Sequence, residues 1–435
     1  MAGFKKIIIQ VFFLVVAVSL ISSCGKRYSF EKKKRSAADS IEQISYENYW
    51  DALRNFDFEY LDTTASAGYE KDLLLAAKFI EDHDLFRAEN KLKDIFRYAQ
   101  DSALRENSLH LLTETLFFKN KWDELLSYDS LVGSKREQKA NEMLLAVEFR
   151  KFEPTRIEYE LDSAEIEMET GPTGVPVIEV EINGSKRKFW FDTGANYTFL
   201  TAKTAEGCGV KFLSPKATKA ITSTKREIYI RPGFARKISF GKIHSYNNPV
   251  VIVMEEDLKF ESEKSGELVQ IDGIIGWKTM QNFAAELDFI NDRLILRKDT
   301  GKFVPNKNFF WSGVPIVKVE HVSGRKLNFF FDTGSEETRI TRNLFKKISF
   351  EEIFSHAEML GTAGGWVYND RKSVAELEIY VGDYLYNFRF IGSVPPIDRN
   401  YLVIDGYIGN EILKNSVVNY SLKSGVFKIS YPEGF

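Results

Sequence analysis

The sequence contains little cysteine and little histidine, and neither sign of charge is in clear excess. Its 435 residues include 2 Cys, 5 His and 11 Pro, and 59 Lys+Arg against 62 Asp+Glu give a formal net charge of −3. Two cysteines cannot build a disulfide framework or a cysteine-rich zinc site. The histidines are scattered, without an HExxH motif and without a plausible Ser or Cys nucleophile beside them. We therefore expect chemistry that uses neither imidazole nor thiol, and the balanced charge favours no nucleic-acid partner.

The first residues have the layout of a bacterial secretion signal. Two lysines precede an apolar run that stops at Ser22, and this run is too short for an ordinary membrane-spanning helix. Ile21–Cys24 resembles a lipobox, in which the cysteine is lipidated and becomes the first residue of the mature protein. We favour residues 1–23 as a lipoprotein signal peptide, with lipidation at Cys24, over a plain secretory signal with an incidental cysteine. The protein is then expected to be lipid-anchored in a bacterial cell envelope, facing the periplasm or the cell surface.

Residues 24–40 form a short polar stretch rich in lysine and arginine. Two interpretations remain open: a tether that lies against anionic lipid headgroups, or a soluble linker. With Cys24 assigned to the anchor, Cys208 is left alone and is expected to be a small buried side chain.

Residues 41–155 are predicted to be helical, because apolar residues recur there at spacings of three and four. Leu85, Ala88, Leu92 and Ile95 illustrate this spacing, and a similar unit follows. Two hairpins of about 35 residues each resemble a degenerate tetratricopeptide (TPR-like) array. This module is a candidate for docking a protein partner; the interpretation that we favour slightly is a spacer that holds the next domain off the membrane.

From about residue 165 onward the sequence contains two copies of one unit, over 165–300 and 305–435. Each copy opens with Gly-Val-Pro, passes a tight turn and an aromatic strand, and reaches an Asp-Thr-Gly turn, an Ile-Asp-Gly-x-Ile-Gly element and a closing strand. The two turns consist of Asp192, Thr193, Gly194 and Ala195, and of Asp332, Thr333, Gly334 and Ser335. The later elements contain Gly273, Ile275 and Gly276, and Gly406, Ile408 and Gly409. This collinear repetition predicts two related lobes.

The two aspartates suggest a specific chemistry. A carboxylate at the end of a buried aromatic strand is costly, and two at equivalent positions of a duplicated unit suggest that they face each other. Two carboxylates in contact cannot both ionise, so such a pair holds one proton over a wide pH range. One member can deprotonate a water while the other protonates a peptide oxygen, and no metal or cofactor is needed.

These motifs resemble those of the retropepsin/pepsin group of aspartic proteases, over about residues 170–435. The resemblance implies a closed β unit per lobe, a peptide cleft between the lobes, and catalysis by Asp192 and Asp332. Because one chain carries both halves, the active unit is expected to be a monomer. The whole chain is thus predicted to be α+β: a TPR-like helical module followed by an all-β, bilobal, double retropepsin-like domain.

Several details depart from the motif or remain open. Asp299-Thr300-Gly301 is a third Asp-Thr-Gly, but charged residues flank it, so we expect a turn between the lobes. A flap hairpin is expected in each lobe. In the second lobe Gly364, Gly365 and Trp366 are its candidate tip, with an ordinary glycine-rich turn as the alternative. In the first lobe no flap can be placed.

Residues in and beside the two turns affect the expected pH dependence and specificity. Glu336 and Glu337 either raise the pKa values of the dyad, or select basic substrates, or face solvent. Ser335 is able to hydrogen-bond the neighbouring carboxylate whereas Ala195 is not, and by family analogy this asymmetry suggests activity nearer neutral pH.

The leading hypothesis is a membrane-anchored aspartic endopeptidase that cleaves envelope or extracellular proteins or peptides. The alternative is a lipoprotein that binds peptides in the cleft, or scaffolds partners, without turnover. In a third interpretation the helical module gates the cleft of a protease.

Overall fold

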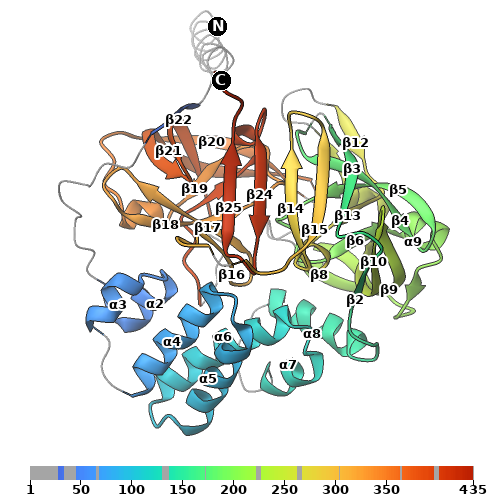
Figure 1. Cartoon of the computed structure of the whole chain (residues 1–435), viewed down its shortest axis with the longest axis horizontal. Coiled ribbons are helices and arrows are strands. Elements are labelled where there is room, and N and C mark those ends of the chain that lie inside the picture. Colours follow the sequence, from blue (N-terminus) through green and yellow to red (C-terminus); the bar gives the residue numbers. More distant parts are fainter. Residues whose placement is uncertain are drawn as a thin grey trace, which may run out of the picture.

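The computed structural model (Figure 1) describes residues 28–33, 46–64, 68–129, 137–171, 173–221, 227–261, 267–302, 304–362, 365–395 and 401–434. The predicted signal peptide, Cys24 and Gly364 lie outside these residues. No helix within them is both long enough and apolar enough to cross a membrane.

Helices follow one another from residue 49 to residue 149, inside the predicted helical segment. They are α2 (Tyr49–Arg54), α3 (Phe58–Thr64), α4 (Tyr69–Glu81), α5 (Leu85–Tyr98), α6 (Ser102–Phe118), α7 (Trp122–Asp129) and α8 (Glu137–Phe149). Asp84 and Asp101 cap α5 and α6, because their carboxylates accept hydrogen bonds from amides of the first turn. The predicted apolar face of α5, including Ala88, Leu92 and Ile95, is buried, and α5 packs against α4 and α6. The TPR-like character of this module stays a prediction.

The remaining chain is rich in strands and forms two lobes of the same topology. The first contains β2 (Arg156–Tyr159), β3 (Ser163–Thr170), β4 (Pro176–Ile182), β5 (Ser185–Phe191), β6 (Thr198–Thr201), α9 (Ala202–Gly207), β7 (Lys211–Phe212), β8 (Thr218–Ile221), β9 (Glu227–Phe240), β10 (Ile243–Val253), β11 (Lys259–Glu261), β12 (Leu268–Gln270), β13 (Gly273–Ile275), α10 (Trp277–Met280), β14 (Phe283–Asp288) and β15 (Arg293–Lys298). The second contains β16 (Phe309–Trp311), β17 (Pro315–His321), β18 (Lys326–Phe331), β19 (Arg339–Thr341), β20 (Ile353–Thr362), β21 (Gly365–Val381), β22 (Tyr384–Val394), β23 (Gly406–Ile408), β24 (Val417–Ser421) and β25 (Val426–Ser430).

Equivalent strands pair in the same way in both lobes. The hairpin β4–β5 corresponds to β17–β18, and the hairpin β9–β10 corresponds to β21–β22. In each lobe the strand of the Ile-Gly element runs parallel to the aromatic strand, β13 beside β5 and β23 beside β18. The predicted Asn183-Gly184 turn closes β4–β5, and both residues have positive φ (51° and 90°), as a type I′ turn requires. The duplication visible in the sequence is therefore a duplication of topology.

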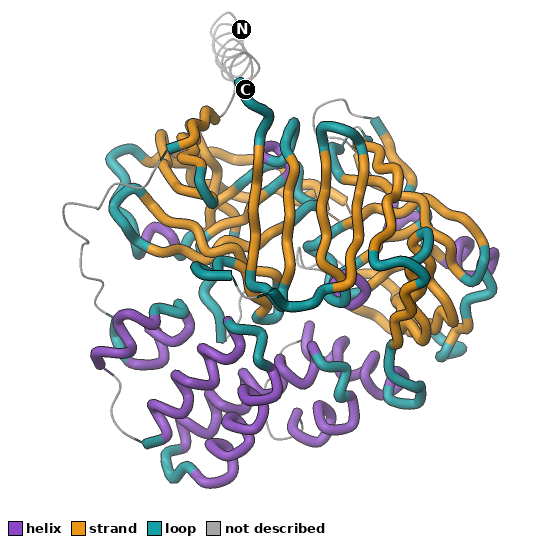
Figure 2. The backbone as a smooth tube through the Cα atoms, viewed as in Figure 1, coloured by secondary structure: helices purple, strands orange, loops and turns teal. Residues whose placement is uncertain are grey.

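One sheet joins the lobes. In it β14 of the first lobe pairs with β24 of the second, with Leu287 opposite Val418, and the strand order is β25-β24-β14-β15-β3 (Figure 1). The helical module covers one side of both lobes, so helices and strands form two layers (Figure 2).

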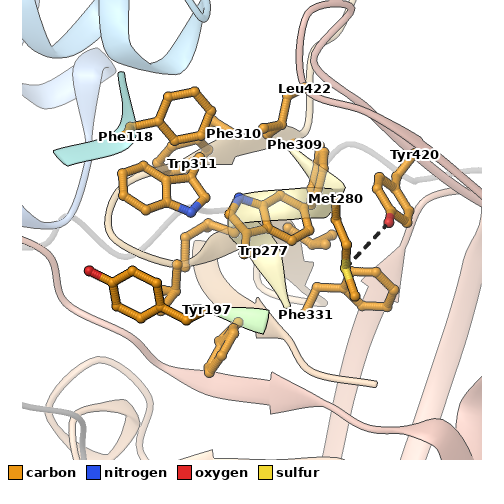
Figure 3. Packing of buried hydrophobic residues seen from close by; sticks show 14 of the residues in the cluster. Phe118, Tyr197, Trp277, Met280, Phe309, Phe310, Trp311, Phe331, Tyr420 and Leu422 are labelled. Carbon is orange, nitrogen blue, oxygen red and sulfur yellow. Dashed lines mark hydrogen bonds between the residues drawn. The ribbon is translucent and has the colours of Figure 1, made fainter. Parts of the chain in front are cut away.

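Aromatic side chains fill the contact between the layers. Phe118 at the end of α6 lies 4.7 Å from Trp311 between ring centroids, and Trp277 and Tyr420 continue the cluster towards Phe331 (Figure 3). Phe331 immediately precedes Asp332, so this core supports the second Asp-Thr-Gly turn directly.

The segment predicted as a tether contains a strand. In β1 (Tyr28–Lys32), Tyr28 pairs with Phe388 and Lys32 with Tyr384, which places β1 antiparallel to β22 at the edge of the second lobe. Tyr28 and Phe30 alternate with Ser29 and Glu31, the two-residue period of a half-buried strand. At residues 28–32 the prediction of a tether or linker is therefore wrong; five residues of alternation are a weak signal between charged neighbours.

Candidate active site

The two Asp-Thr-Gly turns lie at the junction of the lobes. Each turn begins where an aromatic strand ends. The parallel pairing of that strand with the strand of the Ile-Gly element fixes the position of the turn. The amide of Asp192 donates to the carbonyl of Ile275 (3.1 Å), and the amide of Asp332 donates to that of Ile408 (3.0 Å). The Ile-Gly elements therefore hold the Asp-Thr-Gly turns at their first residue.

The two threonines bind the turns to each other. The Thr193 hydroxyl donates to the Phe331 carbonyl (2.7 Å) and accepts from the Thr333 amide (2.9 Å). Thr333 makes the mirror-image pair, to the Phe191 carbonyl (2.7 Å) and from the Thr193 amide (2.9 Å). All four bonds are buried, and they place the two carboxyl groups face to face.

Only glycine fits beside the facing carboxyl groups. A Cβ atom at Gly194 would lie 2.3 Å from Oδ1 of Asp332, and one at Gly334 would lie 2.5 Å from Oδ1 of Asp192. The amides of Gly194 and Gly334 donate to Oδ1 of Asp192 (2.7 Å) and of Asp332 (3.0 Å). A Cβ at Gly194 would also lie 3.0 Å from Oδ1 of Asp192, so the two carboxyl groups lie on either side of the same point.

Burial raises the pKa of both aspartates above the usual range of a carboxyl group. For Asp332 the negative charge of Asp192 raises the pKa further. Loss of the first proton from the pair therefore disfavours loss of the second, and the singly protonated state extends towards neutral pH.

The glycines of the later elements allow a second close approach. A Cβ at Gly276 would lie 1.9 Å from the Tyr197 carbonyl oxygen, and one at Gly409 would lie 2.4 Å from that of Glu337. Gly273 and Gly406 are likewise packed against Phe189 and Phe329 of the aromatic strands. The loop of each Asp-Thr-Gly turn is thus crossed closely by the Ile-Gly element of its own lobe.

The residues after these glycines hold the loops of the Asp-Thr-Gly turns in place, and no motif in the sequence predicted them. The amides of Trp277 and Lys278 donate to the carbonyls of Ala195 (2.7 Å) and Asn196 (2.9 Å). In the second lobe the equivalent donors are Asn410 and Glu411, and the acceptors are Ser335 (2.8 Å) and Glu336 (3.0 Å). The side chains differ between the copies because the contacts use backbone atoms, so only the position after the glycine signals them.

Ser335 was expected to hydrogen-bond the neighbouring carboxylate, which Ala195 cannot do, but the structure does not show this difference. The Ser335 hydroxyl donates its proton to the Glu337 carbonyl (3.0 Å) and so has none for Asp332. The Glu337 side chain is 14% exposed and pairs with Arg339 (2.9 Å), so it does not simply face solvent.

Each lobe has a hairpin between its Asp-Thr-Gly turn and its Ile-Gly element. In the second lobe β20 pairs with β21 up to Thr362 opposite Gly365, and Gly361 lies opposite Trp366. In the first lobe, where no flap could be placed from the sequence, β8 pairs with β9, and Ile221 lies opposite Glu227. The strand β11 of the first lobe contacts β20, so the first lobe reaches the hairpin of the second.

The remaining polar candidates lie elsewhere in the fold. Asp299 follows β15, and its Oδ1 accepts from the Gly301 amide (3.2 Å) and the Ser421 hydroxyl (2.9 Å), which makes it a turn residue between the lobes. Cys208 is buried and unbridged. Over the described ranges, no group of three or more His, Cys, Asp or Glu residues could hold a metal ion.

Residues 178–279 match the aspartyl protease family model. The matched span runs from β4 to α10 and contains the first Asp-Thr-Gly turn and its Ile-Gly element, whereas the second turn lies outside it. Among solved structures the chain is similar to a retropepsin-like aspartic protease from Rickettsia conorii, at 21% identity, over 34% of this chain and 97% of that chain, with a TM-score of 0.24. No curated protein matches the chain. The family match supports aspartic protease chemistry in general.

Proposed function

We propose that this protein is an aspartic endopeptidase in which Asp192 and Asp332 form the catalytic dyad. The observation that carries the proposal is that two buried carboxyl groups face each other, at turns that Thr193 and Thr333 bind together. Paired buried carboxyl groups weaken a fold unless they serve a purpose, because each must be desolvated. A pair that shares one proton supplies a general acid and a general base at the same point.

The dyad performs the reaction in two stages, addition of water and breakage of the bond between carbon and nitrogen, each with two proton transfers. The ionised carboxylate accepts a proton from a water molecule, whose oxygen forms a bond to the peptide carbonyl carbon. The protonated carboxyl donates its proton to the carbonyl oxygen, which gives a neutral tetrahedral intermediate. The bond between carbon and nitrogen then breaks, the leaving nitrogen receives a proton from the dyad, and the intermediate returns one proton to restore the starting state.

The two hairpins support a peptide as the substrate. β8–β9 and β20–β21 occupy equivalent places in the two lobes, and in our proposal they cover a peptide that lies between the lobes, with Gly365 and Trp366 at the end of the second hairpin. One chain supplies both halves of the site, so the active unit is a monomer.

Lipidation at Cys24 and an envelope location complete the proposal. Cys24 precedes Tyr28 by four residues, which span at most ~14 Å. Since β1 belongs to the second lobe, a lipid on Cys24 would hold that lobe close to the bilayer. This arrangement argues against the helical module as a spacer, because the helices come after β1 and do not separate the anchor from the lobes. Recruitment of a protein partner by the helices remains part of the proposal.

The decisive experiment incubates residues 25–435 with a mixed peptide library between about pH 4 and 8. We expect cleavage that Asp192→Asn and Asp332→Asn each reduce by at least ~1,000-fold, because neither variant can share a proton as the wild-type pair does. A transition-state-mimicking aspartic protease inhibitor should block the same activity. Cleavage that survives both substitutions would contradict the proposal, and saturable peptide binding without cleavage would indicate the peptide-binding alternative.

A further inference from the structure

The N-terminal strand β1 replaces a strand that the second lobe does not supply itself. In the first lobe the edge of β10 is covered by β2, with Tyr159 opposite Ile243. The equivalent edge of the second lobe is β22, and β1 covers it with Lys32 opposite Tyr384. Ile243 and Tyr384 each follow the glycine turn of their hairpin by two residues, so β1 and β2 occupy equivalent places.

Aromatic contacts hold β1 in this place. The ring of Phe30 stacks on Tyr431 at 4.0 Å and lies 5.5 Å from Tyr386. The hydroxyl of Tyr28 donates to the backbone carbonyl of Glu411 (2.6 Å), and burial raises the pKa of Tyr28 to about 12. Specific contacts therefore hold the strand in place over its whole length, and one of them is the hydrogen bond from Tyr28 to Glu411.

Glu411 is the residue that locks the second catalytic loop. Its amide donates to the Glu336 carbonyl (3.0 Å), and its carboxylate accepts from the Thr338 amide (2.7 Å). Both partners lie within six residues of Asp332. A chain of direct contacts thus leads from Tyr28 through Glu411 to the loop that carries one catalytic carboxyl group.

The first lobe has a different partner at the same position. There Lys278 takes the place of Glu411, and its ammonium donates to the carbonyls of Phe117 and Phe118 (the latter at 3.3 Å) at the end of α6. Each catalytic loop is therefore held by a residue that contacts a part of the chain preceding both lobes. For the Asp192 loop this part is α6, and for the Asp332 loop it is β1.

We propose that β1 is a positioning strand for the Asp332 loop and that it acts through Tyr28 and Glu411. The proposal rests on the proposed function, because its main readout is peptide cleavage. It implies that the same short segment that leads to the predicted anchor also completes the catalytic lobe.

The first test uses point variants of residues 25–435. Tyr28→Phe removes only the hydroxyl that binds Glu411, and we expect kcat to fall about fivefold, the factor for one net hydrogen bond, with KM changed less than about twofold. Lys32→Ala is the matched control, because Lys32 lies on the same strand with an exposed side chain. A wild-type kcat in Tyr28→Phe would overturn the proposal.

The second test supplies the strand in trans. A chain that begins at residue 34 is expected to have at least tenfold lower kcat, and a synthetic peptide of residues 26–34 should restore it saturably. The same peptide with Phe30→Asp should not, because a carboxylate cannot enter the aromatic cluster. Undiminished kcat in the shortened chain overturns the proposal. If that chain does not fold, Phe30→Ala in residues 25–435 takes its place. A kcat at least tenfold lower is again the expected result, and an undiminished kcat again overturns the proposal.

A third measurement does not depend on cleavage. Hydrogen exchange at the Thr338 amide should be faster in Tyr28→Phe than in wild type and unchanged in Lys32→Ala. If no form of the protein cleaves peptides, the proposed function fails, yet faster exchange in Tyr28→Phe still supports positioning of the loop. Unchanged exchange, or faster exchange with unchanged kcat in a protein that cleaves, would overturn the proposal.

Discussion

At the scale of single residues, the site depends on small residues that pack against the two aspartate carboxyl groups. Gly194 and Gly334 leave room for the opposite carboxyl group, and Thr193 and Thr333 connect the turns through backbone and hydroxyl groups. These residues are short, so the geometry is set by the backbone and not by adjustable side chains. This explains why the motif could be recognised in the sequence: its residue types are the ones that the backbone geometry requires.

The threonines provide a first prediction at this scale. Thr333→Val keeps the shape but removes a hydroxyl that donates to Phe191 and accepts from Thr193. Because two buried backbone groups lose their partner, we expect the free energy of unfolding to fall by about 2 kcal/mol. Thermal or urea unfolding measures this, and kcat should fall at least about tenfold because the turns separate. Thr333→Ser, which retains the hydroxyl, should recover most of both, and a serine variant as impaired as valine would contradict this explanation.

The raised pKa values of the dyad predict a pH dependence of stability. A carboxyl group whose pKa is higher in the folded state binds more protons folded than unfolded, so its contribution is greatest at low pH. It is lost as the pH rises from about 4, the pKa of an unfolded aspartate, through the raised values of the folded state. We expect the free energy of unfolding of the wild type to fall over this window relative to a variant with both Asp192→Asn and Asp332→Asn. Urea unfolding at several pH values measures the difference, and parallel curves for the two proteins would show that burial does not shift these groups.

At the scale of helices and strands, the contact between α6 and α10 connects the helical module to the catalytic loop of the first lobe. Lys278 is 5% exposed, donates to two carbonyls at the end of α6, and lies 4.0 Å above the Phe117 ring. A cation at a helix C-terminus is favoured by the helix dipole and by the unpaired carbonyls there. The helices are therefore in direct contact with the residue that locks the Asp192 loop.

This contact leads to a prediction about the interface. Lys278→Met removes the buried ammonium from the carbonyls of Phe117 and Phe118, which keep only the Asn120 amide (3.1 Å) and the Gln281 side-chain amide (3.2 Å) as donors. Because hydrogen bonds to a charged group are lost, we expect the free energy of unfolding to fall by about 2 kcal/mol. Lys428→Met is the control, because Lys428 is exposed on β25. Denaturant unfolding of both variants measures the effect, and equal losses in the two would show that the interface contact is not the cause.

The strands also show what sequence reasoning could and could not reach. The hairpin at Asn183-Gly184 and the paired aromatic strands were predictable, because each is signalled locally and the duplication repeats the signal. The hairpin β8–β9 was not, because the segment around Ala220 to Tyr229 has no glycine to mark its turn. The strand β1 was missed for a different reason: its partner β22 is far away in the sequence, and nothing near Tyr28 reveals that pairing.

At the scale of the whole molecule, the order of parts along the chain differs from their order in space. The chain begins in the second lobe with β1, passes under both lobes as helices, builds the first lobe, and only then returns to complete the second (Figure 1). The predicted three-part division into helical module and two lobes therefore describes the sequence better than the fold, because the second lobe draws strands from both ends.

This threading sets the timing of assembly. Tyr28 leaves the ribosome early, whereas Glu411, which its hydroxyl binds, comes 383 residues later. If an N-terminal lipid holds the start of the chain at a membrane, β1 waits there, unpaired, while almost all of the protein is synthesised and translocated. A chain that ends before β22 lacks both the partner strand of β1 and Glu411, so it cannot complete the second lobe. Under the proposed function, the fold therefore withholds activity until nearly the whole chain has been synthesised.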